Sequence, residues 1–432
     1  MFWHSVRLAY SLLAYAALPL AFGRLAWRAR KLPGYGQRWR ERLAFYPFPP
    51  EPGVVWFHAV SVGEAEVAFP LVRELLGRHP AARILLTCTT PTGSARIQAV
   101  LGQAVRHVYL PYDLPDAVGR FLTHFRPVLG VILETELWPN LYRQCRAAGI
   151  PLAIVNGRLS EKSARGYRLA SGLTRDTLAA VNVIAVQTAL DAERYIGLGA
   201  APEKVVVTGN IKFDIGFPDS LRQRAAALRA ELFGTRPVWI AGSTHPGEEQ
   251  AILTAFAAIR RDLPEALLIL APRHPERTPE VQALCTGAGF AVRRRSEARS
   301  GDADVFLLDT VGELRGFYGS ADVAFVGGSL VARGGHNVLE PAAAGVPVLF
   351  GPHVFNFAEI ARQLVASGGA IPVRDATELA HWTARLLAEP ERRTELGAKG
   401  RRFVEENRGA LARVSELIAG LLRSATAPPC GD

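Results

Sequence analysis

Cysteine is scarce in this sequence of 432 residues. Its four cysteines lie far apart and form no CxxC pair, which excludes a disulfide-stapled scaffold and a thiolate zinc site. Charged residues make up only 21% of the chain and hydrophobic residues 49%, which excludes an intrinsically disordered or fibrous protein. At about 150 residues per domain, the length instead predicts two or three globular domains.

A general excess of positive charge is also absent. The formal net charge is +10, but residues 1–48 alone hold eight basic side chains against one acidic side chain. This segment accounts for +7 of the total, so the remaining chain carries only +3. A protein that binds nucleic acid through a basic face would spread lysine and arginine over its folded domains. The distribution therefore excludes a nucleic-acid partner.

Long apolar stretches are missing except at the N-terminus, where residues 8–23 are uncharged and are followed by a basic cluster. About 20 apolar residues are needed to span a bilayer, so the run fits either a thin span or a helix embedded in one leaflet. The positive charge follows the run instead of preceding it, unlike a cleaved secretory signal. We predict an uncleaved membrane anchor over residues 1–30, with the basic cluster on the cytoplasmic side. The alternative is an ordinary buried N-terminal helix.

From residue 53 onward, short β-branched runs alternate with helical stretches, which is typical of α/β domains with parallel sheets. Before residue 217 the expected strands are residues 54–60, 83–89, 107–111, 128–134, 152–156, 183–187 and 205–208. After it they are residues 238–242, 267–272, 305–309, 323–327 and 346–350. The pattern predicts two doubly wound domains, residues 31–216 and 217–432, the second ending in a helical tail. Ligands of such sheets bind beyond the carboxyl ends of the strands, so functional residues are expected directly after the strand runs.

Glu64 follows the first expected strand and opens a helix. Because a helix N-terminus stabilises negative charge, we expect this carboxylate to stay ionised and to be able to act as a general base. The alternative is a helix-terminal charge that only stabilises the helix dipole.

Two further strand ends carry charged residues in the first half. Glu134 and Glu136 follow residues 128–133, and they suit either a divalent-metal site or a carboxylate that orients a basic partner. Lys212 follows the last expected strand of this half, where a cation can neutralise charge that develops during a reaction. A solvated lysine is the alternative.

The second half combines four strand ends that suit an anionic ligand, at residues 241–249, 272–275, 309–314 and 327–341. Pro272 and Arg273 follow one strand, and a planar guanidinium fits a phosphate. A glycine-rich loop begins at Gly327, where glycines allow the backbone to approach a ligand closely, and a helix that begins near Asn337 directs its N-terminus at an anion. Glu340, one turn further, suits ribose hydroxyls. Although turns need glycine for other reasons, the combination predicts a nucleotide pocket.

Four strings carry a resemblance to a known family: Ser61-Val-Gly-Glu64, Glu134-Thr-Glu-Leu-Trp-Pro139, Gly209-Asn-Ile-Lys212 and Gly334-Gly-His-Asn-Val-Leu-Glu-Pro341. With these strings the sequence resembles the 3-deoxy-D-manno-octulosonic acid (Kdo) transferase family over nearly its whole length. The resemblance implies a GT-B fold, meaning two Rossmann-like domains, with the N-terminal helix as membrane anchor. It also implies a glycosyltransferase of lipopolysaccharide biosynthesis that uses CMP-Kdo as donor and a lipid A precursor, lipid IVA, as acceptor. The expected location is the inner membrane, facing the cytoplasm.

Site residues follow from the same resemblance, motif by motif. It implies that Glu64 is the catalytic base and that Glu134 and Lys212 stabilise the transition state. The first domain would bind the acceptor and the second the donor, and neither a metal nor a cofactor is implied. The implied CMP-binding residues are Pro272, Arg273, Val311, Gly312, Glu313, Asn337, Val338, Leu339 and Glu340.

The chemistry of the residues agrees with this assignment. A sugar hydroxyl is a poor nucleophile until a carboxylate removes its proton, and a single displacement by such a hydroxyl inverts the anomeric centre. We expect Arg38, Arg40 and Arg42 to lie near the membrane, where they bind either the anionic acceptor or lipid phosphate. Two alternatives remain open: another membrane-associated GT-B transferase that uses a UDP-sugar, and a catalytically silent protein that binds sugar nucleotides.

Overall fold

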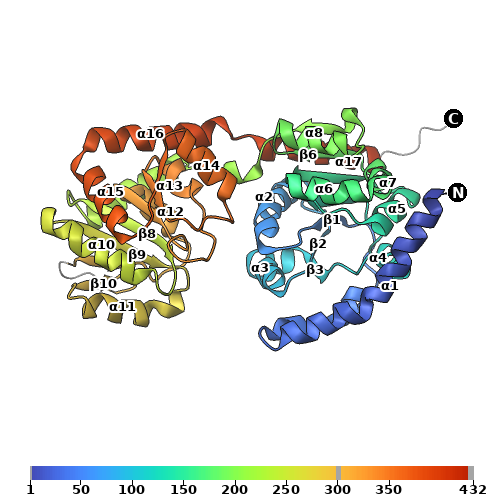
Figure 1. Cartoon of the computed structure of the whole chain (residues 1–432), viewed down its shortest axis with the longest axis horizontal. Helices are drawn as coiled ribbons and strands as arrows, with labels where there is room; N and C mark the ends of the chain where they lie inside the picture. Colours follow the sequence, from blue (N-terminus) through green and yellow to red (C-terminus); the bar gives the residue numbers. More distant parts are fainter. Residues whose placement is uncertain (1, 298–302, 427–432) are drawn as a thin grey trace. The chain divides into compact units, whose positions relative to one another are not determined.

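The computed structural model describes residues 2–297 and 303–426, and the chain divides into two compact units. Unit 1 consists of Met1–Lys212 together with Gly409–Asp432, and unit 2 consists of Phe213–Arg408. Each unit is a parallel sheet covered by helices on both faces (Figure 1). The predicted fold class, two doubly wound α/β domains with an apolar N-terminal helix, is confirmed.

Unit 1 is built on a seven-stranded parallel sheet with the order β3-β2-β1-β4-β5-β6-β7. Its strands are β1 (Val55–His58), β2 (Ile84–Cys88), β3 (Arg106–Tyr109), β4 (Leu129–Leu133), β5 (Leu152–Gly157), β6 (Val183–Val186) and β7 (Val205–Val207). The β1, β2, β4 and β5 strands are buried throughout, as expected for central strands that have helices on both faces. The strand order reverses direction between β1 and β4, so this is the switch point of the sheet.

Helices cover both faces of this sheet and bury one apolar cluster on each. The helices of unit 1 are α1 (Phe2–Ala29), α2 (Val62–Arg78), α3 (Pro91–Leu101), α4 (Pro115–Phe125), α5 (Pro139–Ala147), α6 (Glu161–Leu169), α7 (Ser171–Ala179), α8 (Ala189–Gly197) and α17 (Ala410–Thr426). Short 3-10 turns are η1 (Pro33–Gly36), η2 (Trp39–Leu43), η3 (Gly102–Ala104), η4 (Pro202–Lys204) and η5 (Ile211–Phe213). Among the described residues, one helical segment, Val6–Ala29, is long and apolar enough to cross a membrane.

Unit 2 has a second seven-stranded parallel sheet, with the order β10-β11-β9-β8-β12-β13-β14 and a switch point between β8 and β12. Its strands are β8 (Val238–Thr244), β9 (Leu267–Pro272), β10 (Val292–Arg294), β11 (Val305–Leu307), β12 (Val323–Val326), β13 (Val348–Phe350) and β14 (Ala370–Pro372). Its helices are α9 (Asp219–Leu232), α10 (Glu249–Asp262), α11 (Thr278–Gly287), α12 (Leu314–Ser320), α13 (Leu339–Ala344), α14 (Ala358–Ala366), α15 (Ala376–Ala388) and α16 (Pro390–Glu406), with the turn η6 (Pro275–Arg277).

The end of the chain departs from the predicted domain division. We expected the whole helical tail to belong to the second domain, but α17 belongs to unit 1. Ala410, Val414 and Ile418 lie four residues apart on one helical face and are buried in the cluster that also contains α2. Arg413 donates from Nε to the carbonyl of Thr208 over 2.9 Å. The tail therefore helps to complete the unit 1 core and holds the chain just after β7.

Candidate functional site

Both carboxylates of the expected catalytic set lie at the switch point of unit 1. Glu64 lies three residues inside α2, which follows β1, and Glu134 comes directly after β4. Because β1 and β4 are paired neighbours, their carboxyl ends meet at one edge of the sheet. Burial raises the pKa of Glu64, and the negative charges of Glu134 and Glu136 add to this shift.

Glu64 folds back over the start of its own helix. Its Oε2 accepts a hydrogen bond from the Val60 amide at 2.7 Å, and its Oε1 accepts one from Ser61 Oγ at 3.3 Å, an arrangement related to a capping box. We expected the helix N-terminus to keep this carboxylate ionised, and this was wrong. Burial raises the pKa of Glu64 to about 8, and the neighbouring carboxylates oppose ionisation further, outweighing the two hydrogen bonds.

Glu134 is held in an unusual backbone conformation beside a lysine. Its φ is +57°, in the left-handed region that residues other than glycine rarely adopt, and its amide donates to the Val155 carbonyl at 2.9 Å. Its Oε1 lies 3.9 Å from Lys212 Nζ. Of the two predicted alternatives, the ion pair supports a carboxylate that orients a basic partner. The described residues contain no group of three or more side chains that could hold a metal ion.

Glu136 was expected only as one member of a pair with Glu134, but it also acts on Glu64 by its own charge. Burial raises its pKa to about 7, and the charge of Glu134 adds to the shift. The shift favours the protonated form of Glu136, and the charge of this group when it is ionised adds to the raised pKa of Glu64.

Asn156 is a residue that sequence reasoning missed. This fully buried side chain lies in β5 at a φ of +54°, and its Oδ1 accepts a hydrogen bond from the Ile211 amide at 3.0 Å. Asn210 Oδ1 in turn accepts from the Lys212 amide at 3.0 Å. The first bond attaches the turn that carries Lys212 to the end of β5, and the second holds the turn itself. An asparagine directly after an apolar strand run was the available signal, because asparagine tolerates the left-handed region.

In unit 2, Arg273 lies directly after β9 with its side chain exposed. Its amide donates to the Thr244 carbonyl at 2.9 Å, which fixes the loop against the end of β8. Its guanidinium has no hydrogen-bond or ion-pair partner within the described ranges 2–297 and 303–426. The structure thus presents an arginine at a strand end, available to an anion.

A pair of histidines lies near this arginine. The Nε2 atoms of His245 and His336 are 2.8 Å apart, and their rings are 5° from parallel. Burial, together with the charges of Arg273 and His274, lowers the pKa of each to about 4. The pair is therefore neutral at pH 7. The positive charge of Arg273 acts on both rings, and such a positive region suits an anionic ligand.

The remaining predicted nucleotide residues differ in what they offer. Val311 is 85% exposed and Gly312 has a φ of +87°, so this turn presents backbone to solvent. The Glu313 carboxylate, however, is already paired with Arg224 at 2.8 Å and with Arg295 at 3.1 Å. Its role in this structure is to anchor the turn.

The second group of predicted nucleotide residues surrounds the start of α13. Asn337 Oδ1 accepts from the Leu339 amide at 3.1 Å, and Asn337 Nδ2 lies 3.3 Å from Glu340 Oε1. Val338 and Leu339 are fully buried, so their side chains pack in the core and only their backbone can serve a ligand. Asn337 and Glu340 remain the polar side chains of this group.

The glycine-rich loop after β12 binds a side chain of the protein itself. We expected the loop backbone to contact a ligand, but its amides donate hydrogen bonds to Glu248. The buried Glu248 carboxylate accepts hydrogen bonds from the amides of Gly328 (2.7 Å), Leu330 (2.9 Å) and Ser329 (3.0 Å), and from the amide of His245 (3.3 Å). These amides hold a side chain of the protein, so this part of the loop is structural.

Comparison with known proteins now decides the family. The model of the family described as 3-Deoxy-D-manno-octulosonic-acid transferase (kdotransferase) matches residues 37–215, and the model of glycosyl transferases group 1 matches residues 240–403. The 3-deoxy-D-manno-octulosonic acid transferase of Haemophilus influenzae is 42% identical over 418 residues, covering 95% of this chain and 98% of the relative. The same-named protein of Bordetella pertussis is 40% identical, covering 84% and 86%. The chain belongs to the Kdo transferase family.

This membership confirms the predicted family and the predicted enzyme class, a glycosyltransferase that transfers Kdo. Solved structures support the fold alone. The structure of MurG from Acinetobacter baumannii is 15% identical, with a TM-score of 0.53, and covers 86% of this chain and 100% of its own. A putative UDP-N-acetylglucosamine 2-epimerase from Listeria monocytogenes is 14% identical, with a TM-score of 0.53, and covers 89% and 100%.

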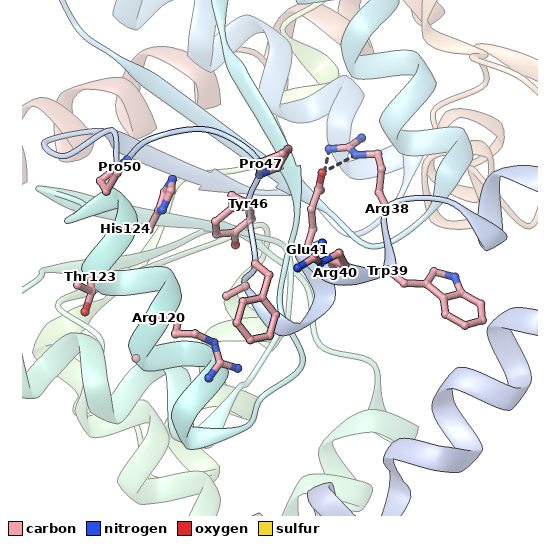
Figure 2. Close-up of a pocket in the computed structure, with 13 residues that line it drawn as sticks. Arg38, Trp39, Arg40, Glu41, Tyr46, Pro47, Pro50, Arg120, Thr123 and His124 are labelled. Atoms are coloured by element: carbon pink, nitrogen blue, oxygen red, sulfur yellow. Dashed lines mark hydrogen bonds and ion pairs between the residues drawn. The ribbon is translucent and has the colours of Figure 1, made fainter.

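The basic segment of this Kdo transferase surrounds a pocket of about 960 Å³ in unit 1 (Figure 2). The three arginines expected to face the acceptor differ in the structure. Arg38 pairs with Glu41 at 2.7 Å, and Arg42 is buried and donates to the Thr89 carbonyl at 2.9 Å. Arg40 alone is exposed, with no side-chain partner in the described part of the chain. Two of the three arginines therefore stabilise the fold.

Proposed function

We propose that this Kdo transferase moves Kdo from CMP-Kdo to the lipid A precursor lipid IVA during lipopolysaccharide biosynthesis. The observation that carries the proposal is Glu64, a carboxyl group at the switch point whose pKa lies near the working pH, close to the Glu134 and Lys212 ion pair. A base is most effective when its pKa is near the operating pH. CMP-Kdo as donor and lipid IVA as acceptor are implied by the sequence resemblance.

The proposed reaction is a single inverting displacement. Glu64 takes the proton of the acceptor hydroxyl while the oxygen of that hydroxyl bonds to the anomeric carbon of Kdo. The bond from this carbon to the phosphate oxygen breaks, and CMP leaves with the bonding electrons. Because the nucleophile and the leaving group occupy opposite faces, the anomeric configuration inverts.

Lys212 and Glu134 have supporting roles in this proposal. The ammonium group of Lys212 stabilises negative charge that develops during transfer, and Glu134 orients it. Asn156 is a positioning residue, because it fixes the turn that carries Lys212.

Asn156→Gly should lower kcat by about 10-fold to 10²-fold, because a displaced catalytic group loses much of its effect. Glycine tolerates the φ of +54°, so the variant removes the hydrogen bond without backbone strain. Asn156→Asp keeps the accepting oxygen and should restore most of the rate. Steady-state kinetics of both variants checks this, and equal rates for the two would contradict a positioning role.

The donor site is proposed to lie in unit 2. Pro272 and Arg273, the turn Val311–Glu313 and the segment Asn337–Glu340 would hold CMP, with Arg273 on its phosphate. The guanidinium of Arg273 meets the charge of the leaving phosphate, so we propose no metal and no cofactor.

Arg273→Ala should weaken CMP binding by about 10-fold to 10²-fold, since a charge-assisted hydrogen bond to the phosphate is lost. Isothermal titration with CMP measures this change in affinity. Arg261→Ala is the matched control, because Arg261 is an exposed arginine in the last turn of α10. Equal losses in both variants would show only a general charge effect. Titration with UDP in parallel tests the alternative donor.

The proposed location is the cytoplasmic face of the inner membrane, with α1 as the anchor. The complete proposal is tested by mass spectrometry of lipid IVA incubated with CMP-Kdo and purified protein. A mass increase by one or more Kdo units supports it and also counts the units. No transfer to lipid IVA by folded protein would overturn it.

A further inference from the structure

Helix α1 has two faces with different surroundings. On one face Ser11 and Leu25 are each only 8% exposed, because they lie against the rest of unit 1. The rest of the helix surface carries large apolar side chains that are mostly exposed: Leu8 (62%), Leu12 (61%), Leu13 (68%), Leu20 (78%) and Trp27 (57%). Figure 1 shows α1 running alongside α4 and α5.

Hydroxyl groups fix the N-terminal half of α1 to the domain. Tyr10 Oη donates to Asp113 Oδ2 at 2.9 Å, and Ser11 Oγ donates to Asn140 Oδ1 at 3.2 Å. Tyr15 Oη donates to Asp116 Oδ1 at 2.5 Å. Asp113 is itself held by the Asn140 amide at 2.9 Å, so the helix is attached to a rigid part of the fold.

Aromatic contacts fix the C-terminal half. The ring of Phe22 lies 5.4 Å from that of Trp39 and 5.7 Å from that of Tyr112. Trp39 also lines the pocket of Figure 2. The helix is therefore attached along most of its length, at Tyr10, Ser11 and Tyr15 and again at Phe22.

This arrangement differs from the usual amphipathic pattern. A helix on the surface of a soluble domain turns its apolar stripe inward, whereas α1 turns the hydroxyl groups of Tyr10 and Ser11 inward beside Leu25 and leaves Leu12, Leu13 and Leu20 exposed. An exposed apolar face of this length marks a surface that another apolar phase covers. The uncharged run of residues 8–23 is 16 residues long, about 24 Å, which is shorter than the bilayer core of about 30 Å.

Basic side chains border the C-terminal part of this face. Arg24 lies on α1, Arg30 directly after it and Arg40 in η2, and all three are exposed without a side-chain partner among residues 2–297 and 303–426. Such positions suit the phosphates of anionic lipid headgroups.

We propose that α1 does not cross the bilayer but lies in its plane, with its leucine face in the lipid and its opposite face attached to unit 1. This inference rests on the proposed membrane location and specifies how the membrane is bound. A spanning helix would have to break the bonds of Tyr10, Ser11 and Tyr15, because Asp113 and Asn140 belong to the folded domain. In the plane, all of these bonds persist.

Disulfide formation in membrane vesicles tests the attachment. Ser11→Cys with Asn140→Cys joins two positions whose side chains are in contact, and it should crosslink to near completion in active protein. Leu12→Cys with Asn140→Cys is the matched control, because Leu12 is adjacent in sequence but 61% exposed, and it should remain at background. Cys88, Cys145 and Cys285 are buried and can be kept, while Cys430→Ser removes the fourth thiol.

Depth measurement tests the orientation without depending on the Asn140 substitution. Nitroxide labels at positions 8, 12, 16 and 20 are placed one at a time in full-length protein, reconstituted in phosphatidylethanolamine and phosphatidylglycerol vesicles. An in-plane helix places all four at one shallow depth of about 5–10 Å. A label at position 18, on the attached side, should show little contact with lipid-soluble oxygen.

The outcomes separate the possibilities. A crosslink at positions 11 and 140 with uniform shallow labels supports the inference. Labels that are deepest near positions 12 and 16, close to the bilayer centre, show a span and overturn it. Labels without lipid contact, together with dimers, show that a second copy covers the face and also overturn it. Active protein that does not bind the vesicles refutes the proposed membrane location itself.

Discussion

Replacing Glu64 by glutamine should lower the rate of Kdo transfer by a factor of about 10² to 10⁴, because the acceptor hydroxyl loses its general base. Glutamine has the same shape and can still accept the Val60 amide hydrogen bond, so α2 should form normally. Initial rates with radiolabelled Kdo measure the effect. CMP binding should persist, since the proposed donor residues belong to unit 2.

Glu66→Gln provides the matched control for this variant. Glu66 lies on the same helix two residues away, but its carboxylate is exposed and pairs with Arg96 at the surface. An exposed ion pair contributes little to stability, so this variant should retain nearly normal activity and stability. A rate for Glu64→Gln close to that of Glu66→Gln would remove Glu64 as the proposed base.

The pH dependence gives an independent test of the same carboxyl group. Because burial raises the pKa of Glu64 to about 8, the group is mostly protonated at lower pH and is inactive as a base. The kcat/KM of the enzyme should therefore rise about tenfold per pH unit below pH 8 and level off above it. A profile that is flat from pH 6 to pH 8 would contradict this assignment.

Stability should change with pH in the opposite direction. Between the ordinary glutamate pKa and about 8, the folded protein keeps a proton on Glu64 that the unfolded chain has lost. Stability therefore falls as pH rises through this range. Glu64→Gln has no such group, so its thermal midpoint should fall less over the same range, which a melting series on both proteins can measure.

The central strands could be predicted from the sequence because their residues are buried on both faces and read as apolar β-branched runs. The edge strands β10 and β14 of unit 2 could not, although the edge strands β3 and β7 of unit 1 were expected as residues 107–111 and 205–208. The outermost strands β10 and β14 have three residues each, one containing two arginines and the other ending in Pro372. An edge strand pairs on one side only and can hold charged residues and proline, so its sequence carries no clear period.

The positions of the site residues at strand ends were also predictable, since topology places them there. Whether these residues are ionised could not be predicted from the sequence. Whether Glu64 is ionised depends on burial by residues distant in sequence and on Glu134 and Glu136, none of which a helix N-terminus reveals. The attachment of α17 to unit 1 was missed for a related reason, because an amphipathic helix shows that it has a partner but does not show which one.

The glycine-rich loop offers the clearest instance of this limit. Its glycines predict open amides, yet Glu248, some 80 residues earlier, fills the loop. Burial raises the pKa of Glu248 while four backbone hydrogen bonds oppose the shift. Oε1 accepts the amides of Ser329 and Leu330, and Oε2 accepts those of Gly328 and His245.

Glu248→Gln should therefore destabilise unit 2 by about 3–5 kcal/mol. In either orientation of the glutamine amide, two buried backbone N–H groups face an NH₂ group instead of an acceptor. Thermal unfolding should show an earlier transition, and hydrogen–deuterium exchange should show lost protection at residues 328–330. The exposed Glu391, in the first turn of α16, gives the control Glu391→Gln. Unchanged exchange in Glu248→Gln would mean that the loop amides do not depend on this carboxylate and are available to a ligand, as the sequence first suggested.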